Sequence, residues 1–198
     1  MSKGRLEAFS DGVIAILITI LVLELKVPHA GDWAALRAVV PTLLMYLLSF
    51  VFVGIYWNNH HHMLHAAERV NGRILWANLH LLFWLSLIPF TTLWMGESHL
   101  APLPTASYGV VLLAAGIGYL ILERSIIAAE GPRSRLAEAV GGVDRKGQLS
   151  AVLYASAVGL AFLRPWLALG IYVFVALMWL VPDPRIEKRL HGSHPPGS

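Results

Sequence analysis

Four histidines lie close together in this sequence, and their spacing is one that a metal ion could use. His61 and His65 are four residues apart, so they would share one face of a helix, and His60 and His62 flank His61. A membrane metalloenzyme, one alternative, would need such groups on several helices, whereas this chain has one cluster at the end of an apolar stretch. The pattern therefore favours histidines at a membrane interface, with one or two hydrogen-bonded inside a helix bundle, over a metal site.

A second group of ionisable side chains lies within the first apolar stretch, residues 5–28. Arg5 and Asp11 stand near one end of this stretch, and Glu24 and Lys26 stand near the other. Ionisable groups in a membrane-spanning helix are costly unless they face protein or water. We therefore expect this helix at the centre of an assembly rather than against lipid.

The composition excludes several classes of protein. With 57% hydrophobic residues, 14% charged residues and a mean hydropathy of +0.63, the sequence is typical of a membrane protein. The absence of cysteine excludes disulfides and thiolate sites. The basic residues lie in short loops, which argues against a nucleic-acid partner. The chain has no phosphate-binding loop, nucleophile elbow or HExxH motif, so we expect neither an enzyme nor a cofactor.

The apolar stretches predict an all-α integral membrane protein with six transmembrane helices. A proline inside a spanning helix is tolerated, so Pro41 implies a kink, and the polar block 58–69 continues the second helix beyond the hydrocarbon edge. The last apolar stretch is too long for one span and is broken at Arg164-Pro165. Residues 133–146 are expected to form a surface loop. The six spans are expected at residues 5–28, 34–58, 75–94, 107–128 and, as two short helices, within 147–181.

The basic residues predict the orientation of these spans. Of the fifteen Lys and Arg residues, all but Lys26, Arg37 and Arg164 fall on one side of a six-span arrangement. The positive-inside rule places that side in the cytoplasm, with both termini, in a multi-pass protein of the inner or plasma membrane. Residues 1–190 are then one transmembrane domain, and residues 191–198 are expected to be a disordered tail.

The helical period gives the first span an apolar stripe. At about 100° per residue, the side chains that fall within about 60° of one another are Phe9, Ile16, Ile20, Leu23 and Val27. Gly12 and Thr19 lie at one edge of the stripe, Ser10 points well away from it, and Asp11 lies nearly opposite. Because a carboxylate needs protein partners, the Asp11 side is expected to meet the other helices of the chain. The stripe then faces lipid or a symmetry axis.

Four residues at the start of the first span form the pattern RxxxFSD, namely Arg5, Phe9, Ser10 and Asp11. This pattern resembles the signature of the transmembrane protein 175 family, the endolysosomal potassium channels and their single-repeat bacterial homologues. Three further matches are Trp57-x-x-His60-His61 at the end of the second span, Asn78 early in the third, and Pro89-Phe90 at its end. The resemblance covers residues 5–90, and six spans correspond to one repeat of that family.

The resemblance implies a potassium-selective or weakly selective cation channel, a homotetramer whose first helix lines a central pore. It implies a hydrophobic constriction of Ile16, Ile20 and Leu23, with Thr19 as the nearby polar group, in place of the TVGYG filter that the chain lacks. His61 and Asn78 are the expected partners of the polar groups on the first helix. The motif and network residues behind the constriction would be Arg5, Phe9, Ser10, Asp11, Trp57, His60, His61 and Asn78.

Two questions stay open at this point. An ion-coupled or proton-coupled secondary transporter is the alternative function, with Asp11, Glu24 and His80 as protonatable candidates, although no internal repeat supports it. Glu24 either raises the cation concentration at the outer mouth of a pore or forms a salt bridge with Lys26, Arg37 or another residue. The expected partners are the lipid bilayer, monovalent cations such as K⁺, and further copies of the chain.

Overall fold

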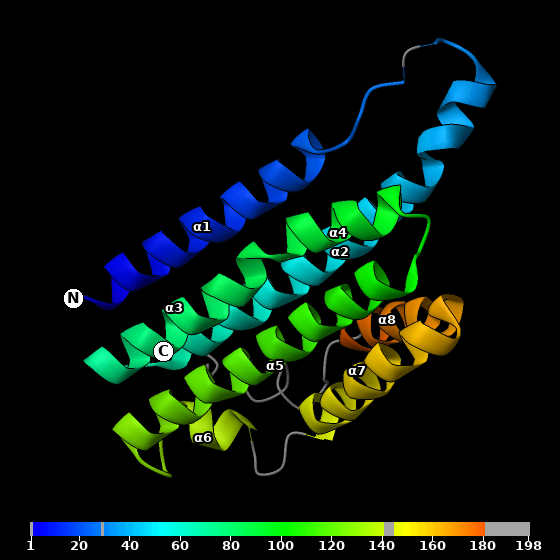
Figure 1. Cartoon of the computed structure of the whole chain (residues 1–198). Coiled ribbons are helices and arrows are strands. Elements are labelled where there is room, and N and C mark those ends of the chain that lie inside the picture. Colours follow the sequence, from blue (N-terminus) through cyan, green and yellow to red (C-terminus); the bar gives the residue numbers. More distant parts are fainter. Residues whose placement is uncertain (1, 29, 141–144, 181–198) are drawn as a thin grey trace, which may run out of the picture.

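A computed structural model describes residues 2–28, 30–140 and 145–180, and within these ranges the regular structure is entirely helical. The all-α prediction is confirmed (Figure 1). In chain order the helices are α1 (Lys3–Leu23), α2 (Trp33–Ala66), α3 (Gly72–Ser86), α4 (Ile88–Glu97), α5 (Pro102–Glu130), α6 (Arg135–Val140), α7 (Arg145–Leu163) and α8 (Pro165–Leu180).

The long apolar helices match the expected spans. By length and composition, α1, α2, the α3–α4 pair, α5 and most of α7 could each cross a membrane. Helix α8 is apolar but shorter, with 16 residues. The predicted break at Arg164-Pro165 is confirmed, because α7 ends at Leu163 and α8 begins at Pro165.

Helix α2 is longer than the apolar stretch that predicts it. It begins after Asp32, whose carboxylate accepts a hydrogen bond of 2.8 Å from the backbone N–H of Ala35. It runs through Pro41 and, as expected, continues into the polar block, but it ends at Ala66, before the end of that block at residue 69. Its first turns stand at an angle to the rest of the helix (Figure 1), which agrees with the backbone hydrogen bond that proline cannot make.

Two predictions about helix boundaries were wrong. The third span is two helices rather than one, because Leu87 ends α3 and Pro89 lies in the first turn of α4, where a missing N–H costs little. Part of the segment expected as a loop forms the short helix α6. The tail predicted for residues 191–198 lies outside the described residues, as do Arg185, Lys188 and Arg189.

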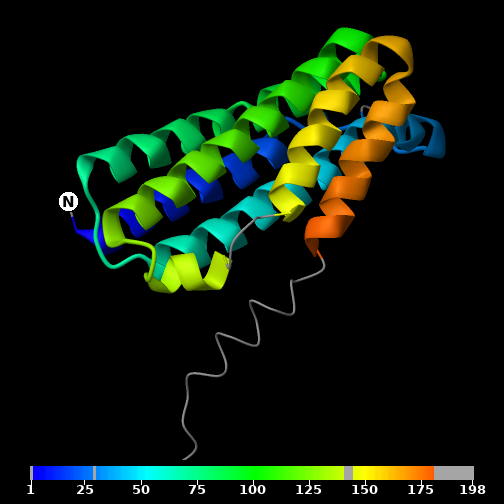
Figure 2. The ribbon, with the colours of Figure 1, turned by 90° about the horizontal axis from the view of Figure 1, so that it is seen from below.

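Helix α5 lies inside the bundle, whereas α1 lies at its edge. Helix α5 packs against α3, α4, α7 and α8, and a Cβ atom at Gly109 would lie 2.2 Å from the hydroxyl oxygen of Tyr172. Glycine therefore permits this close approach. Helices α7 and α8 lie side by side (Figure 2). Helix α1 packs on one side only, against α2, α3 and α4 (Figure 1). Within one chain, the first helix is thus not central.

Candidate functional site

Helix α1 has a buried face and an open face. Its buried side chains recur every three or four residues and are Leu6, Ser10, Ile14, Leu17 and Leu21. On the opposite side, 58% of Ile16 and 80% of Leu23 are exposed. One face therefore fixes α1 to its own chain, and the other is available to lipid or to another chain.

A network of buried hydrogen bonds fixes the buried face of α1 against the neighbouring helices. The hydroxyl of Ser10 donates to the backbone carbonyl of Leu6 and accepts a 2.9 Å hydrogen bond from the side-chain amide of Asn78. The carbonyl oxygen of Asn78 accepts a 2.7 Å hydrogen bond from Nε2 of His60. These three polar side chains come from α1, α3 and α2, and at most 1% of each is exposed. Because an unpaired polar group is costly when buried, the network specifies how these three helices meet.

Asp11 is held separately, by the indole of Trp57. The indole Nε1 donates a 3.0 Å hydrogen bond to the carboxylate of Asp11, which is half-buried. The Trp57 ring stacks on His61 at a centroid distance of 6.0 Å, and His61 stacks on His65 at 6.1 Å. These three rings form an exposed ladder along α2.

The structure assigns the buried role to His60 rather than to His61. The sequence prediction paired His61 with the polar groups of α1, but His61 is exposed, and the bond to Asn78 comes from His60. Adjacent residues on a helix point about 100° apart, so a one-residue error in phase exchanges a buried for an exposed position. The structure does bring Asn78 to Ser10.

The RxxxFSD motif is divided between the two faces of α1. Ser10 and Asp11 point toward the other helices, whereas Arg5 and Phe9 are exposed. The first two motif residues thus lie on the open side of the helix.

The open face of α1 is broader than the predicted stripe. It includes Gly12 and Thr19, and a Cβ atom at Gly12 would meet nothing within 4 Å. The hydroxyl of Thr19 donates a 2.8 Å hydrogen bond to the carbonyl of Ile16. Ile20 is half-buried and lies at the edge of the face. Ile16, Thr19 and Leu23 are therefore the members of the predicted constriction that the single chain leaves open.

At the end of α1 near Leu23, a salt bridge joins the chain to α4. Lys26 pairs with Glu97 rather than with Glu24, and both the hydrogen bond and the charge of Glu97 raise the pKa of Lys26. Glu24 is exposed and lines a cleft of about 720 Å³ between this segment, α2 and α4. Glu24 is therefore accessible from this cleft.

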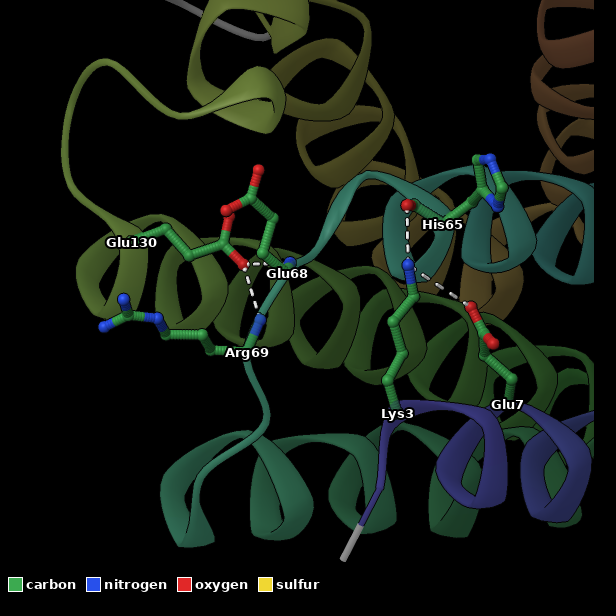
Figure 3. A network of polar contacts seen from close by, with 6 residues as sticks. All are labelled: Lys3, Glu7, His65, Glu68, Arg69 and Glu130. Atoms are coloured by element: carbon green, nitrogen blue, oxygen red, sulfur yellow. Dashed lines mark hydrogen bonds and ion pairs between the residues drawn. The ribbon is translucent and has the colours of Figure 1, made fainter.

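At the opposite end of α1, two side chains fix the connection between α2 and α3 (Figure 3). The ammonium of Lys3 donates a 2.7 Å hydrogen bond to the backbone carbonyl of His65, at the end of α2. The carboxylate of Glu130, at the end of α5, accepts hydrogen bonds from the backbone N–H groups of Glu68 and Arg69. Sequence reasoning missed these contacts, although a lysine beside the last carbonyls of a helix is a recognised pattern.

A second polar cluster in the core was also missed. The hydroxyl of Ser49 lies 2.6 Å from that of Thr92 and 2.9 Å from that of Tyr108. These residues join α2, α4 and α5. Hydroxyl residues within apolar helices carry little positional signal, because each can also bond to its own helix, as Thr92 does to Ile88.

The histidines are not gathered as metal ligands in the described part of the chain. There, no group of three or more His, Asp or Glu side chains is placed to hold a metal ion. His80 instead accepts a 3.1 Å hydrogen bond from the indole of Trp84, one turn further along α3.

Comparison with known proteins places this arrangement in a family. Residues 5–89 match the family model described as endosomal/lysosomal potassium channel TMEM175. A protein named potassium channel from Chryseobacterium sp. (strain P1-3) is 55% identical over 190 residues, which are 96% of this chain and 98% of that protein. The chain belongs to the TMEM175 family. The human TMEM175 protein, named an endosomal/lysosomal proton channel, is 40% identical over 96 residues, which are 42% of this chain and 19% of that protein.

The fold agrees with a solved TMEM175 structure. The crystal structure of a lysosomal potassium-selective channel TMEM175 homologue from Chamaesiphon minutus matches with a TM-score of 0.80 and 29% sequence identity. The match covers 90% of this chain and 96% of the other. The TMEM175 resemblance of the RxxxFSD motif is thereby confirmed, and the chain is a multi-pass membrane protein.

Proposed function

We propose that this chain is the subunit of a potassium-selective or weakly selective cation channel in the cell membrane. Relatives from Chryseobacterium, Streptomyces collinus and Chamaesiphon minutus are named potassium channels, and each match spans most of both chains. The RxxxFSD motif occupies the start of α1, as the family resemblance implies. No observation in the structure specifically favours the ion-coupled transporter.

The two-faced character of α1 is the observation that carries this proposal. Ser10 and Asp11 secure one face to α2 and α3, while the opposite face is apolar, exposed and at the edge of the bundle. Four copies arranged with this face inward would place their first helices around a common axis. The proposed assembly is therefore a homotetramer with α1 lining a central pore.

In this assembly, Ile16, Ile20 and Leu23 form an apolar neck. The three positions recur about once per helical turn, and at about 1.5 Å rise per residue the neck is on the order of 10 Å long. Apolar side chains that meet at one level exclude water, so the closed state needs no charged plug. Thr19 supplies a hydroxyl oxygen at the same depth.

The outer mouth and the orientation follow from charge. Glu24 is exposed just beyond Leu23, where a carboxylate attracts cations toward the neck. The basic residues Lys3 and Arg69 lie near the N-terminal end of α1 (Figure 3), which is the end away from Leu23 (Figure 1). Under the positive-inside rule that end is cytoplasmic, so both termini of the 1–190 domain are placed in the cytoplasm.

Flux into liposomes tests the proposed function. Purified protein is reconstituted with an outward K⁺ or Na⁺ gradient, and ion flux is followed with and without a proton ionophore. A channel gives electrogenic flux along the gradient of the cation alone, and a selective one gives more for K⁺. Flux that occurs only with a coupled proton gradient would instead identify a transporter.

A further inference from the structure

A groove lined by aromatic rings lies between α2, α5, α7 and α8, on the far side of α2 from α1. It encloses about 60 Å³, and its walls include Tyr56, Tyr119, Tyr154 and Trp179. Tyr56, Tyr119 and Trp179 are half-buried, so the groove opens on the surface of the helix bundle. We infer that this surface, which does not include the open face of α1, faces lipid.

Small residues and fixed rings keep the groove empty of protein side chains. Gly116 and Ala151 line it, and a Cβ atom at Gly116 would lie 3.7 Å from the hydroxyl oxygen of Tyr56, an ordinary contact. The indole N–H of Trp179 donates a 2.9 Å hydrogen bond to the hydroxyl of Ser150. Because this polar atom is bonded to protein, the Trp179 ring offers the groove mainly apolar surface.

Basic side chains stand at one end of the groove. The ammonium of Lys146, at the start of α7, lies 5.9 Å from the centre of the Trp179 ring. On α5, Gly116, Leu120 and Arg124 follow one another at intervals of four residues, so the exposed Arg124 continues the groove-lining row by one turn. The neighbouring residue Glu123 is buried, and both Glu123 and Lys146 take part in further interactions of their own.

This combination of features matches one class of ligand. An apolar slot open to lipid suits an acyl chain, and tryptophan with basic residues at the ends of apolar helices is typical of the headgroup level. Basic pockets between transmembrane helices bind anionic headgroups. We propose that the groove seats a short stretch of one acyl chain of an anionic phospholipid, with the headgroup phosphate between Lys146 and Arg124. The site is separate from the proposed pore and does not depend on it.

Native mass spectrometry of the full chain in detergent tests this site. The protein is titrated with dioleoyl phosphatidylglycerol and, separately, with dioleoyl phosphatidylcholine. We expect one tightly held phosphatidylglycerol per chain, with an apparent affinity about tenfold above that for phosphatidylcholine. Equal affinity for the two lipids would overturn the proposed headgroup contact.

Two leucine substitutions separate the groove from the general lipid surface. Gly116→Leu fills the groove and is expected to lower phosphatidylglycerol affinity about tenfold. Gly159→Leu adds the same bulk to α7 at an exposed position where a Cβ atom meets nothing within 4 Å, so affinity is expected to stay unchanged. Equal affinities of the two variants would overturn the assignment to the groove.

A spectroscopic measurement keeps the proposal testable if Gly116→Leu does not fold. Vesicles that contain phosphatidylglycerol with brominated acyl chains quench nearby tryptophans. The difference in quenching between wild type and Trp179→Phe isolates Trp179, and Lys146→Gln combined with Arg124→Gln is expected to reduce that difference. A Trp179 signal that brominated phosphatidylcholine quenches as strongly, or that the double variant leaves unchanged, would contradict an anionic-lipid site.

Discussion

The side-chain amide of Asn78 donates a 2.9 Å hydrogen bond to the hydroxyl of Ser10, where neither residue has measurable exposure. Asn78 also accepts the hydrogen bond from His60, so one amide joins three helices. Asn78 uses its amide both as a donor, to Ser10, and as an acceptor, from His60. The contact therefore fixes the rotation of α1 about its own axis.

Asn78→Ala is expected to destabilise the protein strongly. The substitution leaves a buried hydroxyl and a buried imidazole with one partner fewer, and each such group costs about 1–3 kcal/mol. Thermal unfolding of the purified protein measures the effect. Asn58→Ala on the exposed side of α2 is the control, and equal melting temperatures for the two variants would show that the network contributes nothing.

Substitutions at Asp11 and Trp57 are expected to impair assembly rather than permeation. A hydrogen bond to a charged group contributes about 1.5–3 kcal/mol to stability. Because Asp11 is only half-buried, we expect its hydrogen bond with Trp57 to contribute toward the lower end of that range. We expect Asp11→Asn and Trp57→Phe to reduce the recovery of tetramer in size-exclusion chromatography. Trp76→Phe, at an exposed position on α3, is the matched control. Normal assembly with lost conduction would instead make Asp11 a permeation site.

Ile16→Asn is expected to raise cation conductance or to lower its selectivity. An amide in the proposed apolar neck would bind water and lower the barrier to a hydrated ion. Flux in liposomes is compared with that of Val152→Asn, the same kind of substitution on the exposed face of α7. Unchanged flux from correctly assembled Ile16→Asn protein would place the stripe against lipid.

The Lys26–Glu97 salt bridge predicts a small dependence of stability on alkaline pH. The pKa of Lys26 is raised above its ordinary value of 10.5, so its contribution is complete below that value and is lost as the pH rises through the raised pKa. Lys26→Gln is therefore expected to melt slightly below wild type at about pH 8 in low salt, and the difference is expected to disappear as the pH rises through the raised pKa of Lys26. A difference that persisted at the higher pH would have another cause.

The proposed orientation predicts the location of a fused reporter. Twelve of the fifteen basic residues fall on the side assigned to the cytoplasm, because only Lys26, Arg37 and Arg164 fall on the other. An activity reporter fused after Leu190 is expected to read as cytoplasmic. A reporter that reads as external would contradict this topology.

The sequence predicts the spans better than it predicts the site. Membrane spans can be predicted from long apolar runs in the sequence. Arg164-Pro165 interrupts such a run with a charge and a missing N–H, so the break between α7 and α8 can also be predicted. The sequence does not show which of His60 and His61 is buried, because both lie in a polar block where no periodic apolar pattern shows which side of the helix faces the core. Asn78 was found from a motif and its depth in the span. Its bond to Ser10 depends on the packing of α1 against α3.

Because α1 packs against its own chain on one side only, the effect of a natural variant in this helix depends on its helical position. Replacements on the inner face, such as those at Ile14 or Leu17, would reduce the amount of protein that reaches the membrane. In the proposed channel, replacements on the outer face, such as those at Gly12 or Thr19, would leave that amount unchanged and alter ion passage. In a complete mutational scan, abundance and conductance would therefore vary along α1 with the same period and in opposite phase.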